Sequence, residues 1–197
     1  KLSFTITSIG YADQIIYRNK AKINDDIYVS GNLGNSYLGL LVLQKKIQLN
    51  QSLKKYFTNK YFMPNINLKL AKNLKKFANT SIDVSDGLLA DLDKMLNNQK
   101  LTYKLYLKDI PVSKTLKKVL NVKNLSKIKY VSNGDDYQVL FTASKKMSGI
   151  IERISQKNRI KLTKIGIIQS SKNKSSIVNG KNRVISHKNK GYFHKFK

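Results

Sequence analysis

The sequence predicts a mixed α/β sandwich, in which helices pack on a mixed β-sheet. Apolar residues make up 41% of the 197 residues and are spread along the whole chain, which favours a globular core over disorder. Helical and strand-like patterns alternate irregularly, and Asn179-Gly180 stands between two apolar pairs as a signal for a type I′ hairpin turn. An irregular alternation that includes a hairpin favours a mixed sheet over a purely parallel one.

The N-terminal part of the chain predicts two strands and two or more helices. Residues 1–10 alternate apolar and polar side chains, and residues 26–30 form a second strand-like run. A turn with two glycines at residues 31–36 then leads into an apolar helix. Residues 44–64 are rich in Lys and Asn and end at Pro64, so we expect short helical pieces on the surface.

The remainder alternates helices with strands. Leu70, Leu74 and Phe77 are spaced four and three residues apart, which predicts an amphipathic helix. The next segments predict, in order, a strand leading into a helix over residues 81–96, strands near 103–107 and 139–141, a helix over 147–154, and a strand at 160–168.

The net charge of +27 raises the question of nucleic-acid binding, but its composition favours another explanation. Lys and Arg total 38 against 11 Asp and Glu, yet Arg occurs only at positions 18, 153, 159 and 183. Nucleic-acid readers usually use Arg for bidentate contacts. The excess of Lys, Asn and Ile is what an A+T-rich genome imposes on any protein, so we do not expect a nucleic-acid partner.

Several classes of protein and site are excluded or disfavoured. The chain has no Cys, which excludes disulfides and thiolate metal sites and favours a reducing, cytoplasmic compartment. No apolar stretch approaches the roughly 20 residues that span a bilayer. His187 and His194 lack metal-ligand spacing to a second ligand, and there is no nucleophile elbow and no Gly-Lys-Ser/Thr phosphate loop.

In so basic a chain, the acidic residues are the informative minority. They gather in two short clusters, Asp83, Asp86, Asp91 and Asp93 in one, and Asp135 and Asp136 in the other. Ser85 and Asp86 stand where a helix is predicted to begin, and free N–H groups at that place attract a phosphate, while a nearby carboxylate can hold Mg²⁺. The alternative is that Ser85 or Asp86 only caps the helix, with Asp91 and Asp93 in solvent, and that Asp135-Asp136 is an ordinary acidic turn.

Several motifs together resemble the thiamine-monophosphate kinase family, in the superfamily of aminoimidazole ribonucleotide synthetase and selenophosphate synthetase. The sharpest match is Ile82-Asp83-Val84-Ser85-Asp86-Gly87-Leu88-Leu89-Ala90-Asp91-Leu92, and the next is Gly134-Asp135-Asp136-Tyr137-Gln138-Val139-Leu140-Phe141-Thr142. Arg18-Asn19-Lys20-Ala21-Lys22, residues 27–34, residues 110–113, Ile165-Gly166 and Lys190-Gly191-Tyr192 follow in the family's order. The resemblance therefore covers essentially the whole chain.

The resemblance implies an enzyme that uses ATP and Mg²⁺ to phosphorylate thiamine monophosphate to thiamine diphosphate, and it implies a homodimer. Asp83 and Asp86 would bind Mg²⁺, Arg18 and Ser85 would contact ATP, and Asp135 and Tyr192 would contact thiamine monophosphate. It also implies that residues 1–18 are the last strand and connector of an N-terminal ATP-binding domain, and that residues 19–197 form the C-terminal α/β sandwich of the superfamily. Since most of the first domain is missing, we expect this polypeptide alone to be inactive.

Some positions depart from the family's pattern. Lys20 and Asn24 stand in place of the usual glycines, Asp135 in place of Glu, Gln138 in place of an acid, and Asn65 in place of the Arg of a Pro-Arg pair. Two other functions therefore stay open. One is a non-catalytic thiamine phosphate binder or a partner subunit of a split enzyme, and the other, less favoured by the composition, is a basic nucleic-acid-binding module.

Overall fold

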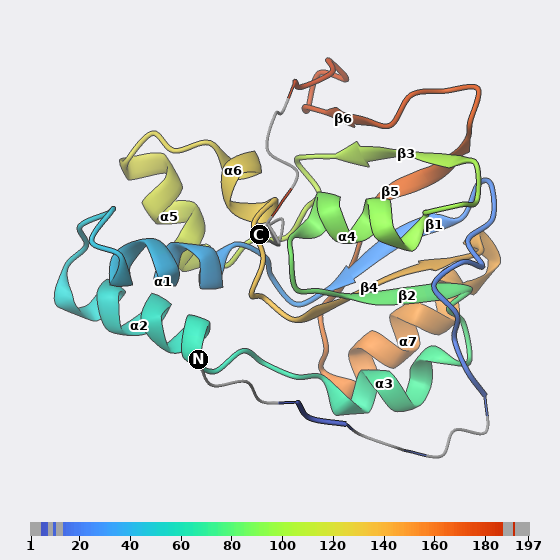
Figure 1. Cartoon of the computed structure of the whole chain (residues 1–197), viewed down its shortest axis with the longest axis horizontal. Coiled ribbons are helices and arrows are strands. Elements are labelled where there is room, and N and C mark those ends of the chain that lie inside the picture. The colour runs from blue at the N-terminus through green and yellow to red at the C-terminus, as the bar shows by residue number, and fades with distance from the viewer. Residues whose placement is uncertain (1–4, 8–9, 11–13, 187–190, 192–197) are drawn as a thin grey trace.

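Six strands form one mixed sheet, with helices on both faces and at one end (Figure 1). The structure is a computed structural model, and it describes residues 5–7, 10, 14–186 and 191. The strands are β1 (Asp26–Ser30), β2 (Thr80–Val84), β3 (Leu101–Tyr106), β4 (Gln138–Ala143), β5 (Leu162–Ser170) and β6 (Ser176–Val178). Their order is β2-β4-β1-β5-β3-β6, and every neighbouring pair is antiparallel except β3 and β6. This is the mixed sheet that the sequence predicts.

The helices divide between the two faces and one end of the sheet (Figure 1). They are α1 (Asn35–Leu43), α2 (Gln51–Phe62), α3 (Leu68–Leu74), α4 (Leu88–Met95), α5 (Lys114–Val122), α6 (Lys127–Val131) and α7 (Ser148–Asn158), with a short 3₁₀ helix at Lys145–Met147. Helix α4 covers one face, where its apolar residues join the largest core cluster. Helices α3 and α7 cover the other face.

Alternation along the strands places neighbouring residues in different cores. In β1, Ile27 and Val29 belong to the core under α4, whereas Tyr28 points to the other face and stacks on Phe141 at 5.3 Å between ring centroids. Because the side chains of a strand alternate between faces, a strand buried on both faces shows a continuous apolar run. A third core joins α1, α2, α5 and α6 beside the sheet.

Most of the predicted elements are confirmed, and two predictions need correction. Residues 44–64 contain one continuous helix, α2, rather than short pieces, and it ends before Pro64 as expected. Asn179-Gly180 does not form a type I′ turn, because neither residue has the positive φ that this turn requires; the positive φ in this loop is at Asn182. The Asn179 side chain accepts from Lys181 and Arg183 N–H groups and widens the loop, so the return strand is only a single bridge from Val178 to Val184.

The predicted strand at residues 1–10 falls mainly outside the described residues. Its described residues, 5–7 and 10, are exposed and carry no strand. The sequence analysis did not predict α5, although Leu116, Val119 and Leu120 form a buried face and Ser113 caps its N-terminus. Within the described part of the chain, no helix has the length and apolar character needed to cross a membrane.

Candidate active site

The loop between β2 and α4 is organised by a buried carboxylate. One oxygen of Asp91 accepts hydrogen bonds from the backbone N–H groups of Ser85, Asp86 and Gly87, at 2.9, 2.9 and 3.0 Å. Asp91 is completely buried. These three N–H groups, which the sequence analysis offered to a phosphate or to a cap by Ser85 or Asp86, therefore bind Asp91 instead. An acid in the first helical turn is favoured there by the orphan donors and by the helix dipole.

Two of the other three acids of this cluster, Asp86 and Asp93, do not lie free in solvent either. The ammonium group of Lys94 bridges the carboxylates of Asp86 and Asp91. These partners raise the pKa of Lys94, the hydrogen bond to Asp86 being the largest cause. Asp93 is half-buried. The pKa of Tyr103 is raised first by the burial of its own ring and next by the charge of Asp93. The alternative in which Asp91 lies in solvent is therefore wrong, and Asp93 is only partly exposed, because the helix places both against neighbouring structure.

The second acidic segment is docked directly on the first. The N–H of Asp135 donates to Ser85 O, and the N–H of Tyr137 donates to Val84 O, both at 2.9 Å. A Cβ atom at Gly134 would lie 1.8 Å from Ser85 O, so only glycine permits this approach. The two acidic motifs, about fifty residues apart in sequence, thus form one surface.

A pocket of about 600 Å³ opens at the junction of these two segments. Three of the predicted site residues, Ser85, Asp86 and Asp135, line it together. The remaining lining residues are Tyr37, Leu40, Tyr61, Asn133, Gly134 and Tyr137. Aromatic and apolar side chains on one side with convergent polar groups on the other are typical of a small-molecule site.

The electrostatics of the pocket show that its acids lie close together. Burial raises the pKa of Asp135, and the charge of Asp86 raises it further. Burial also raises the pKa of Tyr137, followed by the charges of Asp135 and then Asp83. Carboxylates that repel each other in a cleft are a common feature of functional sites, since a bound cation relieves the repulsion.

The other predicted site residues are placed differently. Asp83 lies exposed on β2 and is not among the residues that line the pocket, although its charge reaches Tyr137. Arg18 lies exposed in a turn and does not line the pocket. Tyr192 lies outside the described residues. Its neighbour in sequence, Gly191, is buried, and a Cβ atom there would lie 2.6 Å from Asp86 O.

The residues present fit a hard divalent cation, but in small number. Carboxylate oxygens are the ligands that Mg²⁺ prefers, and Asp86 and Asp135 supply them at one pocket. The ammonium of Lys94 already binds Asp86, which shows that this carboxylate attracts a cation. Among the described residues, no group of three or more His, Cys, Asp or Glu is placed to hold a metal ion.

The sequence analysis missed the roles of Asp91, Lys94 and Tyr137. Asp91 could have been recognised from the sequence. It is an acid in the first turn of α4, and the Gly-containing loop before this helix has N–H groups that need acceptors. Lys94 lies three residues after Asp91, a spacing at which opposite charges meet on a helix. Tyr137 gave no such signal, because its position depends on a left-handed backbone at residues 135 and 137.

Comparison with known proteins relates the chain to one family. No family model matches the sequence. The chain is 34% identical over 98% of its length to thiamine-monophosphate kinase of Buchnera aphidicola subsp. Acyrthosiphon pisum, and 35% identical over 98% to that of Buchnera aphidicola subsp. Schizaphis graminum. It covers 60% of each of these two proteins, so it spans less than two thirds of their length.

Solved structures give the same relation for the fold. The crystal structure of thiamine-monophosphate kinase from Stenotrophomonas maltophilia K279a matches 85% of the chain with a TM-score of 0.74 and 25% identity, over 54% of that protein. A structure described as AaThiL complexed with AMPPCP and TMP matches 90% with a TM-score of 0.71, and the hydrogenase maturation protein HypE in complex with ATP matches 87% with a TM-score of 0.59. The fold is therefore that of the aminoimidazole ribonucleotide synthetase superfamily, and the chain is a relative of the thiamine-monophosphate kinases over nearly its whole length.

Proposed function

We propose that this chain forms part of an ATP- and Mg²⁺-dependent kinase that converts thiamine monophosphate to thiamine diphosphate. The observation that carries the proposal is the pocket that gathers Ser85 and Asp86, which match the family's motif, with Asp135, where an Asp takes the place of the family's usual Glu. One of the related structures, AaThiL, is a complex with AMPPCP and TMP. The reaction is inferred from the relatives, and the pocket is the place on this chain where we propose that it occurs.

The chain's own residues suit phosphoryl transfer by positioning. Asp86, together with Asp83 three residues before it, would hold Mg²⁺. The metal ion would neutralise phosphate charge during the transfer. Ser85 would contact ATP, and Asp135 would orient thiamine monophosphate against the aromatic side of the pocket. Such reactions need little covalent chemistry from the protein, since positioning and electrostatic stabilisation supply most of the catalysis. Arg18 and Tyr192 remain proposed contacts for ATP and for the substrate.

The described acids at the pocket are too few for a triphosphate with its metals, so a further segment or chain would complete the site. We propose that a segment or chain that corresponds to the part of the relatives not matched here completes the site, with a homodimer as the complete assembly. The cysteine-free composition supports a cytoplasmic location.

A second candidate function is a thiamine phosphate binder without catalysis. The small number of metal-ligand acids among the described residues favours it, because binding of a monophosphate requires fewer charges to be neutralised than phosphoryl transfer from ATP.

Calorimetry with thiamine monophosphate and an assay for thiamine diphosphate separate these functions. On the chain alone, we expect thiamine monophosphate to bind and no thiamine diphosphate to form. Asp135→Ala should weaken binding about tenfold, whereas Glu152→Ala, which removes an exposed acid on α7, should not. Equal affinities for both variants would refute the assignment of the pocket. Turnover only when the missing portion is added would favour the kinase over the binder.

A further inference from the structure

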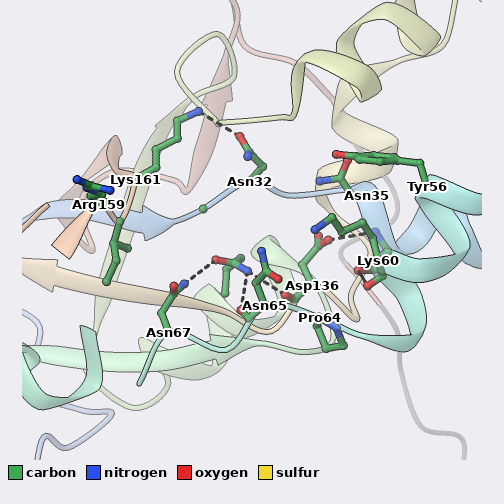
Figure 2. Close-up of a pocket in the computed structure, with 14 residues that line it drawn as sticks. Asn32, Asn35, Tyr56, Lys60, Pro64, Asn65, Asn67, Asp136, Arg159 and Lys161 are labelled. Carbon is green, nitrogen blue, oxygen red and sulfur yellow. Dashed lines mark hydrogen bonds between the residues drawn. The ribbon is translucent and has the colours of Figure 1, made fainter. Parts of the chain in front are cut away.

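A second polar pocket, of about 240 Å³, lies beside the candidate active site (Figure 2). The segment from Asp135 to Gln138 runs between the two pockets, and its residues alternate between them. Asp135 and Tyr137 line the candidate active site, whereas Asp136 and Gln138 line the second pocket. The second pocket contains none of the residues to which a role in the kinase reaction is assigned above.

Positive charge dominates the lining of the second pocket. Lys60, Arg159 and Lys161 reach it from α2, from the end of α7 and from the start of β5, and Figure 2 shows them around its rim. Arg159 is one of only four arginines in the chain, and it caps α7 in the left-handed conformation, with φ 53°. The guanidinium group is a planar fork of donors that matches the oxygens of a phosphate.

The only acid that lines the pocket is buried and hydrogen-bonded. Asp136 is 4% exposed, and its carboxylate accepts from the N–H groups of Gly34 at 2.5 Å and Ser36 at 3.2 Å. Burial raises the pKa of Asp136 to about 7, which reduces its negative charge near neutral pH. Asp136 therefore holds the loop before α1 in place and offers little competition for the three cations.

Amide groups add neutral donors to the cations. The Oδ1 atom of Asn35 accepts from Ser113 at 2.7 Å, and the Oδ1 atom of Asn32 accepts from Lys161 at 3.1 Å. Since each oxygen is engaged, the NH₂ group of each amide is the part left to donate to a ligand. Asn35 is 6% exposed and lines the pocket, so its donor is fixed by packing.

We propose that this second pocket binds a small phosphate-bearing anion. Three cations and two amide donors converge on a space whose single acid is buried and hydrogen-bonded. The volume lies below the roughly 300 Å³ at which pockets for drug-sized ligands begin, so the pocket suits inorganic phosphate or a small phosphorylated metabolite rather than a nucleotide.

Titration of the whole chain with inorganic phosphate tests this proposal. Affinity and stoichiometry are measured by calorimetry at constant ionic strength, set with sodium chloride, because a chain of net charge +27 also attracts anions without a site. We expect saturable binding of one phosphate, weakened at least about tenfold by Arg159→Gln or Lys161→Gln. Arg153→Gln, which removes an exposed arginine of the same helix, is the matched control and should change affinity less than about twofold.

Two results would overturn the proposal. Equal weakening by Arg159→Gln and Arg153→Gln would show that phosphate binds only as a counterion. A loss of phosphate binding in Asp135→Ala, with Arg159→Gln unchanged, would place the phosphate in the candidate active site instead. If the pocket assignment for the kinase fails while Arg159→Gln still weakens phosphate binding, the second pocket stands on its own.

Discussion

Replacing Asp91 with alanine would remove the group that closes the loop between β2 and α4. One carboxylate oxygen of Asp91 accepts three backbone N–H bonds of 2.9–3.0 Å, and the other accepts from Lys94 at 3.2 Å. Of these three hydrogen bonds, only the one from the Gly87 N–H is fully buried. Those from Ser85 and Asp86 are partly buried. Water can therefore replace Asp91 at two donors but not readily at the third.

The expected loss of stability follows from these contacts. A hydrogen bond to a charged group contributes about 1.5–3 kcal/mol, so three would sum to more than about 4.5 kcal/mol if they were independent. Because two donors can be rehydrated and because bonds to one oxygen are not additive, we expect about 3–4 kcal/mol for Asp91→Ala. This would remove a large part of the 5–15 kcal/mol typical of a domain.

Urea unfolding followed by circular dichroism measures the loss. Removing any acid from this basic chain adds repulsion, so Glu152→Ala on the exposed face of α7 is the control for charge alone. A difference between the two variants below about 1 kcal/mol would refute the conclusion that Asp91 organises the loop.

Three further predictions concern the docked loops, the buried acid and the bridging lysine. Gly134→Ala should lower the free energy of unfolding by more than about 3 kcal/mol, because its Cβ would lie 1.8 Å from a backbone oxygen. Gly149→Ala in α7, where a Cβ would have nothing within 4 Å, should leave it unchanged or raise it by up to about 1 kcal/mol. Urea unfolding of both variants measures the difference. Asp136 has a pKa of about 7 when folded and an ordinary value of 3.8, so the folded state binds more protons between these values. Stability should therefore fall as the pH rises from about 4 to about 7, and the difference in unfolding free energy between the parent chain and Asp136→Asn, measured across this range, should show that slope; a constant difference would contradict it. Lys94→Gln should raise the affinity of the candidate active site for Mn²⁺ several-fold, because it removes the ammonium group that now binds a pocket carboxylate, while Lys157→Gln should not; electron paramagnetic resonance of free Mn²⁺ measures both.

The sequence predicted those parts of the fold that depend on local patterns. The strands β1, β2 and β4 were recognised because short apolar runs bounded by turn residues are typical of buried strands. Ser85, Asp86 and Asp135 were predicted as site residues, and the structure brings them to one pocket. The likeness to a family, rather than spacing alone, assigned the function to these positions.

The remainder depends on contacts that a linear pattern does not contain. The carboxylate that satisfies the loop N–H groups is Asp91, because α4 turns it back over the loop, whereas the sequence alone left open that Asp91 lies in solvent. The hairpin after β6 follows the side chain of Asn179, which binds its own loop, rather than the dipeptide preference. In both places a side chain that binds backbone N–H groups two to six residues away decides the conformation of the loop.

Two positions named above as departures from the family's pattern, Gln138 and Asn65, meet in space. Nε2 of Gln138 donates to the backbone O of Asn65 at 3.3 Å, and its Oε1 accepts from Ser30 at 2.8 Å. The resemblance to the family leads us to expect an acid at the first position and an Arg near the second. Since Gln138 is 6% exposed, an acid at this position without a cation beside it would be costly, whereas the amide is satisfied as both donor and acceptor. With an uncharged amide at position 138, Asp136 is the only acid that lines the second pocket.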